Sequence, residues 1–319
     1  MSDVYDCAFR TILNDCRQMI LPLINEVFGE HYTGEEIVTF FPNEHFISGQ
    51  EGEDKERIVD TNFSVIGKTE KKYHWECQSS ADSKMLIRLF EYDAQIALDQ
   101  GQSGSETLTV EFPNSAVLYL RSTGNTPNRY KYIIKTPGGS IEYDIPILKI
   151  KIFSSEEIFN RKLYMLIPFY IFNFESEFEE YESNKSKLEQ LEAEFKKIID
   201  RLATLEKDGT IGGYDKHVLI RLTDNVVKQI AARYTKILQG VSEVMSGPLI
   251  EIEGRKYKEE GLKEGLKEGL KEGLKEGKFK SLIESVKNLV KNTGWSVDQA
   301  LNTLAVSPED RAQILPMLQ

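Results

Sequence analysis

Residues 57–78 of this chain read RIVDTNFSVIGKTEKKYHWECQ, which is the pattern of a β-hairpin. The first part, residues 57–66, is rich in β-branched side chains and ends at Gly67. A polar stretch follows, and residues 73–78 then form a second run that contains aromatic side chains. Two such runs separated by turn residues are typical of paired strands. The sequence therefore predicts two antiparallel strands joined by a short turn.

The register of this hairpin brings three side chains capable of binding a metal to one face. If the turn centres on Lys68, antiparallel pairing sets Asp60 opposite Glu76. Side chains alternate along a strand, so Glu76 and Gln78 share one face and their immediate neighbours take the other. We therefore expect Asp60, Glu76 and Gln78 to lie together. His74 belongs to the same strand face, where we expect a polar residue at the edge of the site.

These side chains have the chemistry of a site for a hard divalent ion. Two carboxylates on adjacent buried strands repel each other and lose hydration, unless a cation or a hydrogen-bond donor compensates their charge. Mg²⁺ prefers oxygen ligands and is often held by one or two carboxylates and a phosphate of the substrate. Such an ion polarises the phosphate and lowers the pKa of an attacking water, which the Gln78 amide would orient. On spacing alone, a solvated or hydrogen-bonded carboxylate is the commoner outcome for Asp60 and Glu76.

Several further motifs follow the hairpin in order along the chain. The series consists of Asp60-Thr61-Asn62, Trp75-Glu76-Cys77-Gln78, the helical residues 85–92, Asn160-Arg161-Lys162, the apolar run 166–170 and the Gly-Leu-Lys-Glu repeats. The hairpin resembles the core of the PD-(D/E)XK nucleases, with Glu-x-Gln in place of Glu-x-Lys. The whole series resembles the Rpn family of recombination-promoting nucleases and putative transposases, and it covers most of the chain.

This resemblance implies a Mg²⁺- or Mn²⁺-dependent DNA endonuclease that acts in recombination, mobile-element biology or phage defence. It implies a catalytic set of Asp60, Glu76 and Gln78. It also implies that an acidic residue of the helix before the first strand joins Asp60 and Glu76 as a metal ligand, and Glu26 is the candidate. The chain departs from the motif at two positions. Val59 replaces the proline, and Gln78 replaces the lysine, which leaves the general base unassigned.

The helix after the hairpin offers side chains for a substrate phosphate. Arg88 and Tyr92 are four residues apart, so they face the same way and could bind a phosphate near the metal. Lys84 belongs to the same helical face. The alternative is a structural role, in which the arginine packs over an aromatic ring, and the sequence leaves both interpretations open.

Composition places the chain among ordinary globular proteins, with a net charge of −11. No stretch approaches the apolar length of a membrane span, and the N-terminus lacks the features of a secretory signal, so we expect a cytoplasmic protein. The three cysteines lack Cys-x-x-Cys spacing, which argues against a zinc site or a disulfide framework. The negative charge argues against strong DNA binding, although residues 175–182 are especially acidic. We expect a modest, salt-sensitive affinity for DNA.

The expected fold is α/β, with a mixed sheet of the α+β kind in the order α-β-β-β-α-β and an extra strand. The elements are a helix near 6–29, a strand at 37–40, the hairpin, a helix at 83–100, strands at 116–120 and 145–153, a loop or hairpin at 126–143, and helices at 177–205 and 215–238. Gly240 is expected to end the last of these helices. An unrelated α+β domain with the same order of elements is the alternative.

We divide the chain into four regions. They are a PD-(D/E)XK nuclease-like domain at 1–172, a helical region at 173–250, a Gly-Leu-Lys-Glu repeat helix or spacer at 251–280, and a small C-terminal helical unit at 281–319. Trp295 as an anchor and the N-cap motif at 307–310 favour an ordered C-terminal unit.

Residues 261–276 are four copies of Gly-Leu-Lys-Glu. Each glycine inside a helix costs roughly 1 kcal/mol relative to alanine, so an isolated helix here is not stable. The leucines recur without exception, which favours self-association over a hydrated spacer and predicts a homo-oligomer. Two other function classes stay open beside the nuclease. One is a weak or inactive member that acts as a DNA-binding or oligomeric interaction protein, and the other is a helical scaffold with a degenerate α/β domain.

Overall fold

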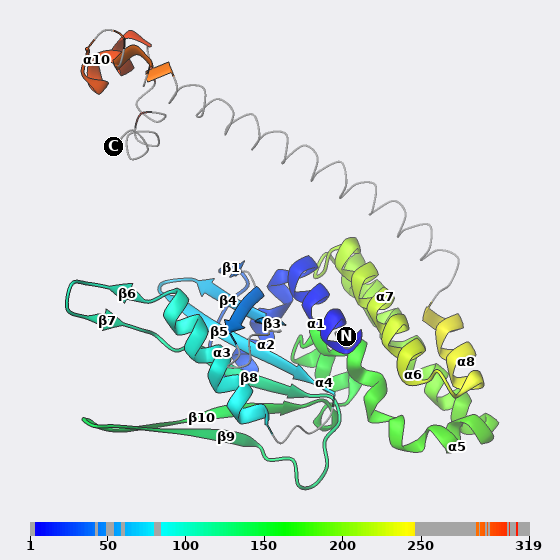
Figure 1. Ribbon diagram of the computed structural model, residues 1–319. Coiled ribbons are helices and arrows are strands. Elements are labelled where there is room, and N and C mark those ends of the chain that lie inside the picture. Colours follow the sequence, from blue (N-terminus) through cyan, green and yellow to red (C-terminus); the bar gives the residue numbers. More distant parts are fainter. Residues whose placement is uncertain are drawn as a thin grey trace. The chain divides into compact units, whose positions relative to one another are not determined.

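The computed structural model shows two compact units, residues 1–251 and 252–319, which we describe separately (Figure 1). The residues that the structure describes are 4–41, 44–48, 54–58, 61–79, 84–245, 285–286, 288–290, 292, 294–304, 306 and 311. Within them the first unit is a mixed α/β structure, which confirms the predicted class. No helix in this part of the chain is long and apolar enough to cross a membrane.

A six-stranded mixed sheet, counted within the described residues, is the centre of the first unit. Its strands, in spatial order, are β1 (Ile37–Phe40), β4 (Thr61–Ile66), β5 (Glu70–Gln78), β8 (Asn114–Tyr119), β10 (Gly139–Lys149) and β9 (Arg129–Thr136). β8 is parallel to both β5 and β10, and the other neighbours are antiparallel. Two short hairpins lie outside this sheet, β2 (Glu44–Ser48) with β3 (Asp54–Ile58) and β6 (Gln102–Ser103) with β7 (Leu108–Thr109).

The β4–β5 hairpin has the predicted register. Thr61 lies opposite Trp75 and Ile66 lies opposite Glu70, so the turn centres on Lys68. β5 begins at Glu70, earlier than the expected start at residue 73, because its pairing with β4 continues to Glu70. The expected single strand at 57–66 is wrong in its first part, since β3 ends at residue 58 and pairs with β2 in a separate sheet. The strand predicted at 145–153 also differs, because its last residues form a 3-10 turn.

The first unit also contains helices and 3-10 segments within its described residues. They are α1 (Val4–Asp15), η1 (Arg17–Met19), α2 (Ile20–Phe28), α3 (Met85–Asp99), η2 (Ile150–Ile152), α4 (Ser155–Asn160), η3 (Tyr164–Asn173), η4 (Glu175–Glu177), α5 (Phe178–Ser183), α6 (Lys185–Lys207), α7 (Gly213–Ile230) and α8 (Thr235–Met245). β9 and β10 form the hairpin that was the alternative for 126–143.

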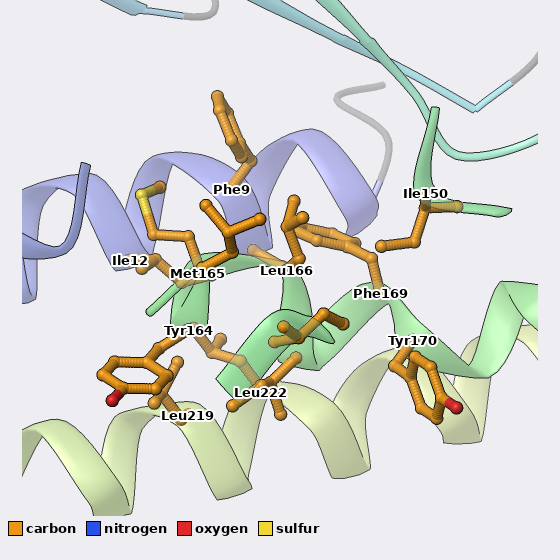
Figure 2. Packing of buried hydrophobic residues seen from close by; sticks show 14 of the residues in the cluster. Phe9, Ile12, Ile150, Tyr164, Met165, Leu166, Phe169, Tyr170, Leu219 and Leu222 are labelled. Atoms are coloured by element: carbon orange, nitrogen blue, oxygen red, sulfur yellow. The ribbon is translucent and has the colours of Figure 1, made fainter. Parts of the chain in front are cut away.

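One face of the sheet packs against α1, α2 and the helices of the second half of the unit. Trp75 and Cys77 of β5 point to this face and are fully buried. η3 is apolar on all sides and buried from Tyr164 to Phe172, which is typical of a helix inside a core. Figure 2 shows Leu166 and Phe169 of η3 among side chains from α1 and α7. One buried cluster therefore joins the sheet to the helical region.

α3 covers the opposite face of the sheet (Figure 1). Its Met85 and Leu89 pack in one cluster with Val117 and Tyr119 of β8 and Tyr132 of β9. The buried positions along α3 recur every three or four residues, which is the spacing of an amphipathic helix. The polar residues of β5 that alternate with Trp75 and Cys77 lie on this covered face.

Three predicted helices are each divided. The helix near 6–29 breaks at Cys16 and forms α1, η1 and α2. The helix at 177–205 breaks at Asn184, whose side chain accepts N–H hydrogen bonds and caps α6. The helix at 215–238 breaks after α7, and α8 then continues through Gly240 instead of ending there. A Cβ at Gly240 would lie 1.9 Å from Glu192 Oε1. This glycine therefore permits close packing of α8 on α6, and reading it as a helix end was wrong.

The second unit contains α10 (Val297–Thr303) within its described residues. Ser296 and Gln299 form a capping box at its start, and Val286, Ala300 and Leu301 are buried together. Trp295, the expected anchor, is 39% exposed and lies outside this cluster. The Gly-Leu-Lys-Glu copies and the motif at 307–310 lie outside the described residues.

Candidate active site

Five polar side chains meet in a buried network between α3 and the sheet, within the part of the chain that the structure describes. They are His74 and Glu76 of β5, Asp93 of α3, Ser115 of β8 and Tyr132 of β9. Strand alternation puts His74 and Glu76 on one face, and the β5–β8 register sets His74 beside Ser115. The inward face of α3 places Asp93 directly above them. Four separate elements thus contribute to one polar site.

His74 is the centre of this network. Its Nδ1 lies 2.7 Å from Asp93 Oδ1, and its Nε2 lies 3.3 Å from Glu76 Oε1. Both carboxylates can accept a hydrogen bond from a ring N–H. Complete burial opposes a charge on the ring, but the hydrogen bonds with Asp93 and Glu76 outweigh it and raise the pKa of His74 to about 9. His74 is therefore a central residue and not the edge residue that we expected.

Asp93 is held from several directions. Besides His74, it accepts hydrogen bonds from Ser115 Oγ at 2.6 Å and from the Tyr132 hydroxyl at 3.2 Å. Burial and the nearby Asp93 charge raise the pKa of Tyr132 above its usual range, so this hydroxyl stays a donor. Tyr143 lies opposite Tyr132 in the β9–β10 register. The buried Tyr143 hydroxyl has no hydrogen-bond partner among the described residues.

Glu76 has nitrogen groups beside both of its carboxylate oxygens. Oε1 faces His74, whereas Oε2 accepts a hydrogen bond from Gln78 Nε2 at 3.2 Å and lies 3.6 Å from Arg88 Nη2. Arg88 also contacts Met85 Sδ at 3.2 Å, and its side chain is 30% exposed. The structure thus brings together three residues that the sequence singled out, Glu76, Gln78 and Arg88.

The other two α3 candidates lie in different surroundings. Tyr92 is buried, and its ring meets the His74 ring edge-on at 6.0 Å between centroids. The Tyr92 side chain therefore packs inside the site against the His74 ring. Lys84 is exposed at the residue before the first turn of α3.

The two remaining predicted metal ligands are not brought to Glu76 by the described contacts. Glu26 lies on α2, which covers the other face of the sheet, and its Oε1 is 2.6 Å from Arg161 Nη1. Asp60 lies outside the residues that the structure describes.

The donor chemistry of the site suits a hard cation only in part. Asn62 lies opposite His74 in the hairpin register, and its Oδ1 is buried without a hydrogen-bond partner among the described residues, as is Ser64 Oγ. Such oxygens and the Glu76 carboxylate are ligands that Mg²⁺ accepts. However, the described residues contain no group of three or more His, Cys, Asp or Glu side chains arranged to hold a metal. The described part therefore offers oxygen ligands without completing a metal site.

Asp93, Ser115 and Tyr132 were missed in the sequence. Asp93 did leave a signal, because it lies between Leu89 and Ile96 on the apolar stripe of α3, where a charge is unfavourable without a partner. Ser115 and Tyr132 gave no such signal, since each is an ordinary residue for a strand.

Comparisons of this chain with protein-family models, with curated proteins and with solved structures found no match.

Proposed function

We propose that this protein is a divalent-metal-dependent nuclease that hydrolyses phosphodiester bonds of DNA and resembles the Rpn family. The observation that carries this proposal is the alternation along β5, which sets Glu76 and Gln78 side by side on the face beneath α3. With the small hairpins β2–β3 and β6–β7 set aside, the element order α2-β1-β4-β5-α3-β8 supports it, because it follows the α-β-β-β-α-β order expected for a PD-(D/E)XK core.

Mg²⁺ or Mn²⁺ is the proposed cofactor, with Glu76 and Asp60 as its carboxylate ligands. When bound, such an ion polarises the scissile phosphate and makes an attacking water more acidic. Asp60 is assigned from the sequence, by its place opposite Glu76 in a hairpin centred on Lys68. Glu26 could act as a ligand only if its ion pair with Arg161 opened.

The protein's own groups would position the water and the substrate. Gln78 donates its amide N–H to Glu76, so its carbonyl oxygen is the part left to accept a hydrogen bond from the attacking water. Arg88 lies beside Glu76 with part of its guanidinium exposed, where it could bind a phosphate oxygen. Lys84 is proposed as a further phosphate contact, and Tyr92 as a packing residue beneath the site.

The acidic run 175–182 opposes DNA binding less than its charge suggests. Glu175 forms a bidentate pair with Arg121, with both N–O distances at 2.7 Å. Glu180 pairs with Lys187, and Glu182 accepts hydrogen bonds from backbone N–H groups at the start of α8. These carboxylates therefore have internal partners.

A plasmid-nicking assay with Mg²⁺ or Mn²⁺, with and without EDTA, tests this proposal. We expect the wild type to nick DNA in the presence of the metal and EDTA to abolish this activity. Asp60→Ala and Glu76→Ala should each show no nicking. Calorimetry with Mn²⁺ should show binding to the wild type and none to Asp60→Ala. Full nicking by both variants, or no metal-dependent nicking by the wild type, would overturn it.

A second candidate is an inactive member that acts as a DNA-binding or oligomeric interaction protein. The observation that favours it is the charge balance of the network, in which His74 and Arg88 offset Glu76 and Asp93 without any metal. DNA binding that is equal in EDTA and in Mn²⁺, with no nicking and no heat of metal binding, would select this function.

A further inference from the structure

We infer that His74 and Asp93 are a positioning pair for Glu76, in which Asp93 fixes the imidazole ring and His74 Nε2 fixes the carboxylate. Neither residue is given a chemical step. This inference rests on the proposed nuclease function, because the exact placement of Glu76 matters for catalysis only there. It adds two residues to the site that the motifs do not contain.

The first support is the geometry around the ring. Two residues apart on one strand, His74 and Glu76 have their Cα atoms about 6.6 Å apart, so an imidazole can span the gap to the carboxylate. The ring is then held at its other nitrogen by Asp93, at 2.7 Å, from a different element of the fold. Rotation of the ring would break both hydrogen bonds, so two contacts fix its orientation.

The second support is that Asp93 is itself held in place. Ser115 from β8 and Tyr132 from β9 donate to its two oxygens, while α3 supplies its backbone. The position of the Glu76 carboxylate thus depends on three strands and one helix. Partners that hold a ligand in this way set its orientation and its basicity.

The third support comes from energetics. Buried charged groups lose hydration, and replacing a buried ion network with apolar side chains of similar size is often neutral or stabilising. Packing beneath α3 is already supplied by Met85, Leu89 and their neighbours. Burying Asp93, His74 and Glu76 together therefore costs free energy that apolar side chains would not cost. Stability alone does not account for this network, and it points to a role in placing Glu76.

Two tyrosines provide a matched test. Tyr132 and Tyr143 are cross-strand partners, but only the Tyr132 hydroxyl donates to Asp93, whereas the Tyr143 hydroxyl has no hydrogen-bond partner among the described residues. Tyr132→Phe is expected to lower kcat for plasmid nicking several-fold, with KM for DNA unchanged. Tyr143→Phe is expected to leave both unchanged. Asp93→Asn should lower kcat by about 10-fold, the low end of the range for losing a partner of a metal ligand, because Asp93 acts on Glu76 through His74.

A measurement on the metal-free protein gives a readout besides activity. The chain has four histidines, so the ring N–H signals of ¹⁵N-labelled protein can be assigned by substitution. His74 should give ring nitrogen signals that report its contacts with Asp93 and Glu76. Glu76→Gln should shift the Nε2–H signal, and Tyr132→Phe should shift the Nδ1–H signal, whereas Tyr143→Phe should shift neither.

The outcomes separate this inference from the proposed function. If the wild type does not nick DNA with either metal, the nuclease proposal fails, and the role of His74 fails with it. If the wild type nicks DNA but Tyr132→Phe and Asp93→Asn keep its kcat, the positioning role alone is wrong. His74 ring signals that Glu76→Gln and Tyr132→Phe leave unchanged would also refute it. The tyrosine pair keeps the test decisive if Asp93→Asn does not fold.

Discussion

Glu76→Gln is expected to destabilise the metal-free protein. From the sequence alone, Glu76 is expected to repel a neighbouring carboxylate. The structure instead places His74 and Arg88 beside it. The substitution keeps the shape of the side chain and removes only its charge, so the stability change measures the attraction between Glu76 and these cations.

The magnitude follows from the contacts of Glu76. Burial lowers the pKa of His74, but the hydrogen bonds with Asp93 and Glu76 outweigh burial and raise it from 6.5 to about 9. The hydrogen bond between His74 Nε2 and Glu76 Oε1 is long, at 3.3 Å, and its loss is expected to cost about 1 kcal/mol. Arg88 is 30% exposed and adds about 0.5 kcal/mol. The expected loss is therefore about 1 to 2 kcal/mol.

The loss should also depend on pH. The folded-state pKa of His74 lies above its unfolded value, so the stabilisation is complete below about pH 6.5 and is lost as the pH rises through about 9. Urea unfolding in EDTA, at about pH 6 and about pH 10, measures both quantities. Glu70→Gln is the matched control, because Glu70 is exposed at the start of the same strand. If Glu76→Gln is as stable as the wild type near pH 6, or its deficit does not shrink near pH 10, the reasoning is refuted.

Three further predictions test other parts of the chain. Gln78→Ala should lower the turnover of nicking with little change in Mn²⁺ affinity, and a large loss of affinity in calorimetry would make Gln78 a ligand instead. Gly240→Ala should leave the free energy of unfolding within about 1 kcal/mol of the wild type, because the end of the flexible Glu192 side chain can turn away from the added Cβ and alanine gains in helix propensity; a larger loss in urea unfolding that Glu192→Ala restores would show that Glu192 is held in place. Deleting residues 261–280 should give a smaller assembly in light scattering with an unchanged thermal transition of the first unit, and equal masses would make the repeat a spacer.

The elements that the sequence predicts well are those determined by neighbouring residues. The hairpin register follows from alternation on both sides of a short turn, so its centre at Lys68 could be read directly. β1 has the predicted bounds, and α3 and β8 differ from theirs by one or two residues. The same alternation correctly put Glu76 and Gln78 on one face.

Errors arose where a distant contact changed the local preference. Gly240 has the usual character of a helix end, yet its lack of a side chain serves the packing of α8 on α6. The start of α8 has a similar origin, because Glu182, more than fifty positions earlier, accepts its first backbone N–H groups. Neither contact leaves a periodic signal in the residues around it.

The amino-acid sequence by itself determined the hairpin, its register and the pair Glu76 and Gln78, because each depends on strand alternation over a few residues. Only the tertiary structure decided what surrounds Glu76. Asp93 lies 19 positions from His74, Ser115 lies 22 positions from Asp93, and Tyr132 lies 39 positions from it. These residues meet because α3 packs its inward face on the sheet, and a buried charge is stable only where such packing brings its partners to it.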